Sequence, residues 1–212
     1  FRRVLFRSGS ATNTDTVYFS TVPSDTGTGV CHVFRTTNGG GNITNITGSL
    51  PDRFPRAIAV NPRKSNELFV VFSGFGTGHV YKSINSGNTW TNVTSTLPDV
   101  PFHTVMYHPT STDTVFVGSD LGVFCSANGG STWFAMNNGL PDGVLVFDLK
   151  YSASDNSIVA VTHGNGVYKA SITNIGVAVE ESPTFVSDFT QQLIGNPVHG
   201  SVLFRSEEHT PE

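Results

Sequence analysis

The chain has 212 residues and a formal net charge of −4; 13% of the residues are charged, 37% are hydrophobic and 22 are glycine. The charged fraction is about half that of an average globular domain, so Ser, Thr, Asn and Gly must supply much of the polar surface. Such a surface excludes a nucleic-acid partner, which would need clustered Lys and Arg. No stretch approaches the roughly 18 consecutive apolar residues of a transmembrane helix, and the many Thr, Val and Phe residues favour β-strands.

The first and last eight residues are expected to be artefacts rather than natural protein sequence. Residues 1–8 read FRRVLFRS and residues 205–212 read RSEEHTPE, and both resemble translated sequencing-adapter DNA. The reverse complement of the DNA that encodes the first segment encodes RSEEHTSE, which differs from the last segment only at Pro211. We therefore leave both segments out of the fold prediction and expect the rest to be a fragment of metagenomic origin.

An internal repeat organises residues 9–172. Leu-Pro-Asp triplets begin at Leu50, Leu97 and Leu140, so the repeats are 47 and 43 residues apart. Strand-like stretches such as 56–62 and 67–73 lie between them, separated by Gly, Asn, Pro and Asp turns. Four short strands in a repeat of about 40–45 residues are typical of a β-propeller blade. The sequence thus predicts an all-β propeller fragment of three to four four-stranded blades.

A turn motif recurs in each repeat and resembles the Asp-box, or BNR repeat, of the pattern Ser-x-Asp-x-Gly-x-Thr-Trp. The best copy contains Ser83, Asn85, Gly87, Thr89 and Trp90; the second contains Ser126, Asn128, Gly130, Thr132 and Trp133; a degenerate copy keeps Thr36, Asn38 and Gly40. All three have Asn in place of the usual Asp, so we expect weaker turns. We assign these residues a structural role between the third and fourth strands, because Asn accepts backbone N–H bonds and Gly permits positive φ.

The resemblance covers residues from about 16 to 172 and is closest to sortilin-like and glycosyl-hydrolase-like BNR propellers. It implies that blades stack around a ring and that each buries its faces against its neighbours. No box follows Ser171. We therefore expect the outer strand of the last blade to come from the beginning of the natural chain.

Residues 173–184 are predicted to be a linker, and residues 185–204 to be a truncated small β segment. The latter is similar to the opening of the bacterial type IX secretion C-terminal sorting domain, whose usual Tyr-Pro-Asn-Pro-Val core is here Ile194-Gly195-Asn196-Pro197-Val198. This resemblance implies export across the outer membrane to a secreted or cell-surface location. The alternative is a second small β-domain or a further turn.

Four carboxylates are candidates for chemistry in the blades. Asp99 and Asp142 recur in the Leu-Pro-Asp turn, which indicates a structural role, and Asp120 lies in a turn common in the resembling family. Asp148 breaks the repeat, because we align it with Ala59 and Val105, and it is therefore our candidate catalytic residue. Glycoside hydrolysis would need a second carboxyl group within about 5–9.5 Å.

Other chemistry-bearing residues form no recognised constellation. His103 and His108 are five residues apart on a strand and should point to opposite faces, so we expect no metal site and no cofactor. Cys31 and Cys125 lie two repeats apart, which favours two free thiols. The arginines Arg35, Arg53, Arg56 and Arg63 fall in one repeat, which disfavours a sialidase. Four aromatics could stack on sugars if they are exposed, although we expect most of them to pack in the core: Phe54, Phe75, Phe102 and Phe134.

The sequence favours a secreted or cell-surface propeller that binds a polysaccharide or a cell-surface protein without catalysis. The alternative is a glycoside hydrolase resembling the xyloglucan-degrading Asp-box enzymes, with some catalytic acids in blades outside this sequence. A sortilin-like peptide-binding propeller is a third possibility, but it lacks the Cys-rich module that usually follows.

Overall fold

The computed structural model describes residues 3–9, 13–22, 30–172 and 188–192, and these residues form strands and no helix. The strands pair in chain order, each antiparallel to the next, and make four sheets of four strands. We call these sheets blades 1 to 4. Blade 1 holds β1 (Arg3–Gly9), β2 (Val17–Val22), β3 (His32–Thr36) and β4 (Thr44–Asn45); blade 2 holds β5 (Pro55–Val60), β6 (Leu68–Phe72), β7 (Val80–Ser83) and β8 (Thr91–Asn92); blade 3 holds β9 (Phe102–Tyr107), β10 (Val115–Ser119), β11 (Gly122–Ser126) and β12 (Phe134–Ala135); blade 4 holds β13 (Val146–Ser152), β14 (Ser157–Thr162), β15 (Val167–Ser171) and β16 (Thr190–Gln192).

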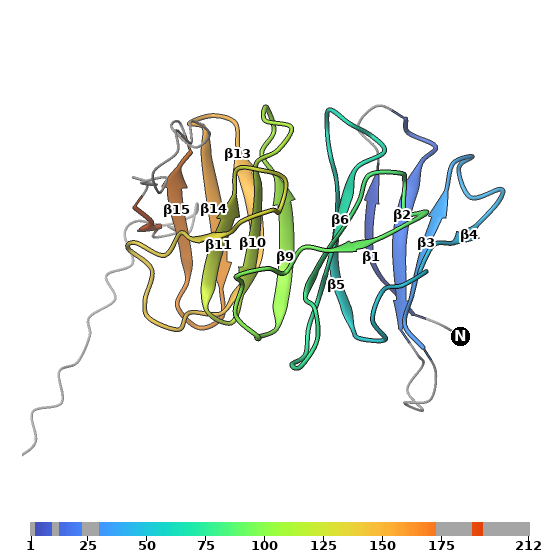
Figure 1. The fold of residues 1–212 in the computed structure, drawn as a ribbon. Helices are drawn as coiled ribbons and strands as arrows, with labels where there is room; N and C mark the ends of the chain where they lie inside the picture. The colour runs from blue at the N-terminus through green and yellow to red at the C-terminus, as the bar shows by residue number, and fades with distance from the viewer. Residues whose placement is uncertain (1–2, 10–12, 23–29, 173–187, 193–212) are drawn as a thin grey trace, which may run out of the picture.

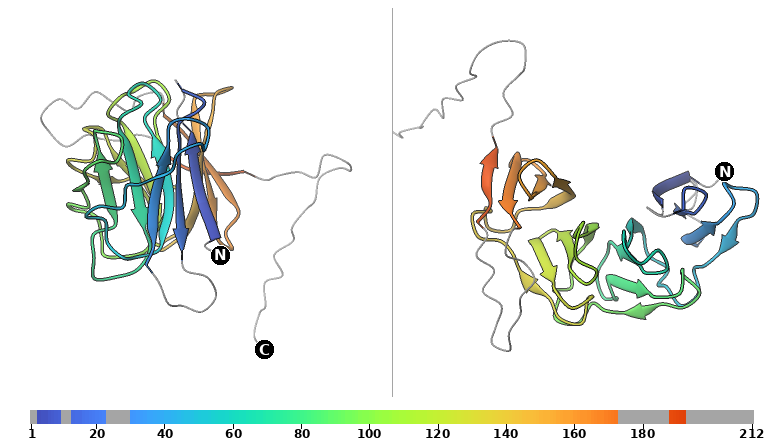
Figure 2. Two further views of the ribbon diagram at one scale, coloured as in Figure 1. Left: turned by 90° about the vertical axis from the view of Figure 1, so that its right-hand side faces the viewer. Right: turned by 90° about the horizontal axis from the view of Figure 1, so that it is seen from above.

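The four blades stand side by side (Figure 1) and follow an arc when seen from above (Figure 2). The first strands β1, β5, β9 and β13 contact one another in sequence, so they form the inner side of the arc. The fourth strand of each blade lies at the far edge of its sheet. The predicted all-β propeller architecture is confirmed, with four blades among the described residues.

The central strands explain why one blade needs neighbours on both sides. Every residue of β6 is buried, and alternate side chains point to opposite faces of a strand. Leu68 and Val70 pack in the core shared with blade 1, whereas Phe69 and Val71 pack in the core shared with blade 3. A blade with no neighbours would expose both of these apolar faces to water.

Three hydrophobic cores lie between adjacent blades rather than inside any one of them. The core between blades 1 and 2 includes Tyr18 and Trp90; the core between blades 2 and 3 includes Phe102 and Trp133. The core between blades 3 and 4 includes Phe116 and also Phe189, from the far end of the described chain. Apolar burial between sheets is therefore what holds the arc together.

The segment at the beginning of the chain belongs to the fold. We expected residues 1–8 to lie outside it, but β1 pairs with β2 from Arg3, opposite Val22, to Gly9, opposite Val17. This strand occupies the inner position of blade 1. The pairing does not bear on the origin of the sequence, so the adapter assignment stays a prediction.

The outer strand of blade 4 differs from our expectation. It is not supplied by the beginning of the chain, because β16 pairs with β15 through Thr190 opposite Lys169 and Gln192 opposite Val167. Residues 188–192 thus close blade 4 from within the segment predicted to be the start of a sorting domain. The predicted linker 173–184, the remainder of 185–204 and the adapter-like segment 205–212 lie outside the described residues.

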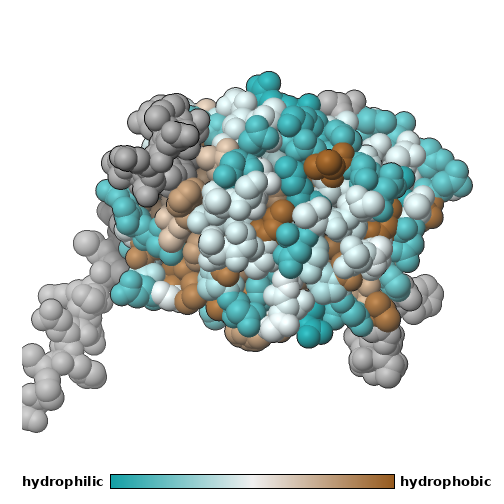
Figure 3. Space-filling model, in the orientation of Figure 1, coloured by the Kyte–Doolittle hydropathy of each residue, from teal (hydrophilic) through white to brown (hydrophobic). Residues whose placement is uncertain are grey.

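Hydrophilic and near-neutral residues cover most of the face in Figure 3, where the hydrophobic ones form separate small groups. This pattern agrees with the low charge and the abundant Ser, Thr, Asn and Gly of the sequence. Within the described part of the chain, no helix is long and apolar enough to cross a membrane.

Candidate functional site

The inner strands of blades 2, 3 and 4 share an irregularity at the same position. The pairing register shifts between Pro55 and Ala57 in β5, across His103 in β9, and between Val146 and Asp148 in β13. A bulge of this kind adds an unpaired residue and re-aims its side chain. The three bulged residues are Arg56, His103 and Phe147, so one side chain outside the regular alternation comes from each of three neighbouring blades.

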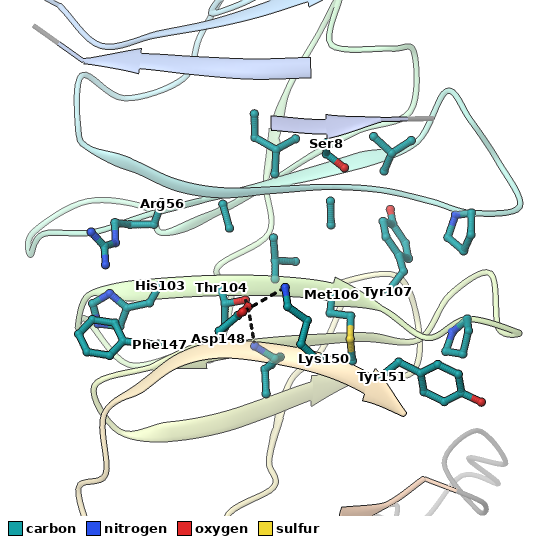
Figure 4. A pocket seen from close by; sticks show the side chains of 18 residues that line it. Ser8, Arg56, His103, Thr104, Met106, Tyr107, Phe147, Asp148, Lys150 and Tyr151 are labelled. Atoms are coloured by element: carbon teal, nitrogen blue, oxygen red, sulfur yellow. Dashed lines mark hydrogen bonds and ion pairs between the residues drawn. The ribbon is translucent and has the colours of Figure 1, made fainter. Parts of the chain in front are cut away.

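A cavity of about 740 Å³ lies along these inner strands. Residues of β5, β9 and β13 form most of its wall, and β1 contributes Ser8. Arg56, His103 and Phe147 gather at one end, and Asp148 and Lys150 lie toward the middle, near Thr104 and Met106 (Figure 4). The end with the bulges is therefore polar and aromatic, whereas aliphatic residues such as Ile58, Val105 and Leu149 line the wall elsewhere.

Asp148, the sequence-predicted catalytic candidate, lines this cavity and is held by three groups. Its Oδ1 accepts a hydrogen bond from the Leu149 backbone N–H at 2.9 Å and from the Thr104 hydroxyl at 3.4 Å. Its Oδ2 lies 3.0 Å from Lys150 Nζ. The side chain is still 43% exposed, so the carboxylate is oriented by its neighbours and can accept hydrogen bonds from a ligand.

Our alignment of Asp148 with the other repeats needs a correction. Asp148 pairs with Val161, Thr104 with Gly118 and Ala57 with Val71, each directly after the bulge. The equivalents of Asp148 are therefore Ala57 and Thr104, not Ala59 and Val105. The sequence alignment was thus two residues off in blade 2 and one residue off in blade 3, but blades 2 and 3 still have no carboxylate at this position.

His103 is fixed in place by the turn between β10 and β11. Its Nε2 lies 2.6 Å from Asp120 Oδ1, and its side chain is only 9% exposed. Its ring packs against Phe147 with 5.4 Å between the ring centroids, and Phe147 in turn contacts His163 edge-on at 5.5 Å. Asp120 does not line the cavity, but it holds the His103 ring in place through this contact.

The remaining candidate carboxylates lie outside the cavity. Asp99 accepts the Gly76 backbone N–H at 2.8 Å and lies 2.8 Å from Nε2 of the buried His79. The hydrogen bond from His79, followed by that from Gly76, lowers the pKa of Asp99 below its usual value. Asp142 is exposed. Asp99 therefore ties two loops of blade 2 together.

Histidine and cysteine form no metal site in the described part of the chain. His103 lies at the cavity, whereas Nδ1 of His108 accepts hydrogen bonds from the backbone of Thr110 and Ser111, and burial lowers the pKa of His108. Cys31 and Cys125 are both free thiols, as expected.

The candidate arginines and aromatics differ in whether they line the cavity and in how exposed they are. Of the four arginines singled out, Arg56 lines the cavity and its guanidinium lies 5.7 Å above the Phe54 ring. Phe54 and Phe75 are exposed, but Phe102 is fully buried and Phe134 is half-buried. Phe147, 39% exposed, is the phenylalanine that lines the cavity, together with Tyr107 and Tyr151. Phe147 was not singled out from the sequence as a candidate binding residue. The signal that could have found it is its alignment with Arg56 and His103 in the neighbouring repeats.

The segments predicted as Asp-boxes, here called box turns (36–43, 83–90 and 126–133), connect the third and fourth strands of blades 1 to 3. In the second, Ser83 Oγ accepts the Gly87 N–H at 2.8 Å and Asn85 Oδ1 accepts the Thr89 N–H at 2.9 Å. Ser126 and Asn128 make the same bonds in the third turn. No box-turn residue lines the cavity.

The box turns also link neighbouring blades. Trp90 Nε1 donates to the Ile46 carbonyl of blade 1 at 2.7 Å, and Trp133 Nε1 donates to the Val93 carbonyl of blade 2 at 2.8 Å. In the opposite direction, Arg35 donates to the Ser86 carbonyl at 2.7 Å. Lys82 donates to the Gly129 carbonyl at 3.2 Å. Blade contacts are thus specified by polar bonds as well as by apolar packing.

Phe189 completes this series in blade 4. It directly precedes β16, as Trp90 precedes β8 and Trp133 precedes β12, and the strand registers align the three residues. Its side chain is 3% exposed in the core between blades 3 and 4. Its backbone N–H donates to the Asn138 carbonyl of the preceding blade at 2.7 Å. Phe189 therefore takes the place of the box tryptophan.

The architecture and its inner cavity define four blades of a β-propeller. No protein-family model matches the sequence, and no curated protein is similar to it. Among solved structures, the GH74 enzyme of Niastella koreensis is similar at 20% identity and a TM-score of 0.64, over 80% of this chain and 28% of that one. The GH74 xyloglucanase of Xanthomonas campestris is similar at 18% identity and a TM-score of 0.62, over 77% and 28%.

A binding protein shares the fold as well. The auxiliary nutrient binding protein of Bacteroides thetaiotaomicron is similar at 10% identity and a TM-score of 0.58, over 79% of this chain and 38% of that one. At these identities the likeness shows the fold alone. The chain spans less than a third of the length of the GH74 structures that it matches.

Proposed function

We propose that this chain is part of a secreted or cell-surface propeller that binds a glycan in the cavity along its inner strands. One observation carries the proposal: the bulges of three neighbouring blades direct Arg56, His103 and Phe147 to the same end of the cavity. A concave site with an aromatic ring and a few oriented polar groups is typical of small-molecule and sugar recognition.

The polar groups beside these residues suit hydroxyl groups. Asp148 offers carboxylate oxygens, and Lys150, whose side chain is 70% exposed, offers N–H donors. A hydrogen bond to a charged group contributes about 1.5–3 kcal/mol, more than a neutral one. The existing contacts of Asp148 with Thr104 and Leu149 orient the carboxylate before a ligand binds, which reduces the entropy lost on binding.

A glycoside hydrolase is the second candidate function, and Asp148 is the observation in its favour. The likeness to GH74 folds supports it in part. Hydrolysis by the usual mechanism needs two carboxyl groups flanking the scissile bond, about 5–9.5 Å apart. Asp148 is the one carboxylate among the described residues that line the cavity, so binding is the better-supported function.

The test is affinity electrophoresis in gels that contain xyloglucan, mixed-linkage β-glucan or galactomannan, with a reducing-sugar assay on the same polysaccharides. We expect retardation by at least one polysaccharide and no release of reducing sugar. Asp148→Ala should weaken retardation, and Asp142→Ala, which removes an exposed carboxylate away from the cavity, should not. Retardation by none of the three polysaccharides would contradict the proposal. Release of reducing sugar by the original protein, but not by Asp148→Asn, would establish the hydrolase.

The secreted or surface location rests on the resemblance of residues 185–204 to a type IX sorting domain. We keep it as part of the proposal. Fusing residues 185–204 of the uninterrupted gene, with its natural continuation, to a reporter in a bacterium with type IX secretion tests it. Retention of the reporter inside the cell would contradict the sorting role and would leave the glycan site unaffected.

A further inference from the structure

Phe147 is an apolar side chain held open to water inside a cavity. Seven large hydrophobic side chains are exposed in the described residues, and Phe147 is the one of them that lines the cavity. Leaving an aromatic ring in contact with water forfeits the hydrophobic free energy that its burial would give. Exposed apolar surface of this kind in a concave site marks a place where a ligand binds.

The ring of Phe147 is fixed before any ligand binds. His103 packs against it at 5.4 Å with a 57° angle between the rings, and His163 contacts it edge-on at 5.5 Å and 81°. His103 is itself fixed by Asp120, 2.6 Å from its Nε2. The bulge in β13 directs the side chain out of the regular alternation. Two ring contacts and the bulge thus restrict the orientation of the ring at the cavity end, and Asp120 supports one of these contacts through His103.

Charged groups line the cavity on the side of Phe147 that leads toward its middle. Arg56 and His103 lie at the same end of the cavity as Phe147, and Asp148 and Lys150 follow toward the middle of the cavity (Figure 4). A ligand that suits the site has a flat apolar face to cover Phe147 and a polar rim to meet these charged groups. A pyranose ring with equatorial hydroxyls has this form, because its axial C–H groups make both faces apolar and its hydroxyls point outward.

We propose that Phe147 is the platform on which a pyranose ring with equatorial hydroxyls stacks, and that His103, held by Asp120, is the residue that positions this platform. The inference rests on the proposed glycan binding and adds the ligand class and the residue that dominates affinity. A few rigid, aromatic residues usually carry most of the binding free energy at such sites, and a fixed ring loses little conformational entropy on binding.

Cellohexaose is the probe, because every ring hydroxyl in it is equatorial. Isothermal titration calorimetry on the full chain should show binding that Phe147→Ala weakens by about tenfold or more, as expected for a central binding residue. Phe147→Trp should bind at least as well as the original protein, and Phe147→Leu should fall between the two. Phe75→Ala is the matched control, since Phe75 is 62% exposed and lies outside the cavity.

Saturation-transfer NMR gives a second readout that does not depend on affinity alone. Stacking should transfer most magnetisation to the axial ring protons of cellohexaose, and Phe147→Ala should abolish that preference. For His103, the preference for the axial ring protons should be lost in His103→Ala together with affinity. His103→Gln, which can still donate to Asp120, should restore part of both, whereas a merely structural residue would change the thermal midpoint and leave this preference in place.

The outcomes separate the two proposals. Polysaccharide binding that is equal in Phe147→Ala and the original protein would overturn the platform and leave the glycan-binding function standing. Retardation by galactomannan without any binding of cellohexaose would overturn the equatorial ligand class. Absence of binding to all of these sugars would overturn the proposed function itself. An unchanged preference for the axial ring protons in His103→Ala would remove the positioning role of His103.

Discussion

The indole Nε1–H of Trp90 donates a 2.7 Å hydrogen bond to the backbone carbonyl of Ile46, in the neighbouring blade. Trp90 is 8% exposed in the core between the two blades, so this carbonyl has little access to water. We therefore expect Trp90→Phe to keep most of the packing but to cost about 1–3 kcal/mol, because a buried acceptor loses its donor. Trp90→Ala should cost about 3–5 kcal/mol, since it also leaves a cavity.

Urea denaturation measures both Trp90 variants. Ile84→Ala is the control, because Ile84 lies in the same box turn as Trp90 but is 61% exposed. Its effect on the free energy of unfolding should be close to zero. Equal stability of Trp90→Phe and the original protein would show that the bond to Ile46 contributes nothing to the interface between blades 1 and 2.

A second prediction concerns the amide that replaces the usual acid in the box turns. Asn85 Oδ1 accepts the Thr89 N–H and Asn85 Nδ2 donates to the Thr89 hydroxyl. In Asn85→Asp the Thr89 hydroxyl can rotate to donate to the carboxylate, and hydrogen bonds to a charged acceptor are about twice as strong. We expect Asn85→Asp to stabilise the protein by up to about 1 kcal/mol near pH 7, measured by urea denaturation.

The matched variant is Asn128→Asp in the next box turn. There Asp113 lies close by, because its carbonyl accepts the Gly129 N–H at 2.7 Å, and the repulsion between two carboxylates should reduce the gain. A larger gain at position 128 than at position 85 would contradict this electrostatic account.

A third prediction follows from the lowered pKa of Asp99. The hydrogen bonds from His79 and from Gly76 favour the charged form in the folded protein. A carboxyl whose folded pKa is below its unfolded pKa contributes stability above the unfolded pKa, and this contribution disappears as the pH falls through the folded pKa. Asp99→Asn should thus lower the thermal midpoint near pH 7, and the difference should shrink below pH of about 4.

Thermal unfolding of both proteins from pH 3 to 7 measures this effect. Asp142→Asn, at the equivalent position of the next Leu-Pro-Asp triplet, removes a carboxylate that His79 and Gly76 do not contact; it is the control and should show no such trend. A difference between Asp99→Asn and the original protein that stays constant with pH would show that charge on Asp99 is not the cause.

A fourth prediction concerns Phe189 and the closure of blade 4. Phe189→Ala should cost about 3–5 kcal/mol, because a large side chain leaves the core between blades 3 and 4. It should also speed cleavage by a protease near β16, since the strand has only three residues. Gln191→Ala, on the same strand but exposed, should change neither property. Full stability of Phe189→Ala would refute its equivalence with the box tryptophans.

The two free thiols should react at different rates. Burial raises the pKa of Cys125 to about 12, and burial together with the nearby Asp52 raises the pKa of the half-buried Cys31. Because the thiolate is the reactive form, both should react slowly with iodoacetamide at pH 8, and Cys31 should react first. Mass spectrometry of timed samples checks the order, and labelling of Cys125 before Cys31 would contradict the burial that the structure assigns to it.

The repeated motifs made the blades predictable. Leu-Pro-Asp triplets and box turns recur with the strands between them, so the periodicity of blades 2 and 3 was visible in residues such as Leu97 and Trp133. Turn chemistry is local and is therefore encoded in consecutive residues. The closure of blade 4 was not predictable in this way, because Phe189 carries no box around it and reaches its place through a long intervening segment.

The site was predictable only in part. Asp148 was found because it breaks the repeat, but Phe147 was not, since one aromatic in an alternating strand resembles a core residue. The bulge in β13 is what separates Phe147 from a core residue. It shifts the pairing register between Val146 and Asp148 and turns the side chain of Phe147 toward the cavity. A bulge depends on how a strand pairs with its neighbour, and the order of residues in one strand does not reveal it.

The late return of β16 has a consequence for the order in which the chain assembles. In blade 2 the third and fourth strands are separated only by residues 84–90, whereas residues 172–189 separate them in blade 4. During synthesis from the N-terminus, blades 1 to 3 can form as soon as each emerges. The core around Met136 is complete only when Phe189 has been synthesised and has packed into it. Closing the loop of residues 172–189 also costs more conformational entropy than closing the short loop of blade 2. Phe189 and β16 thus join the core between blades 3 and 4 only after the other three strands of blade 4 have been made.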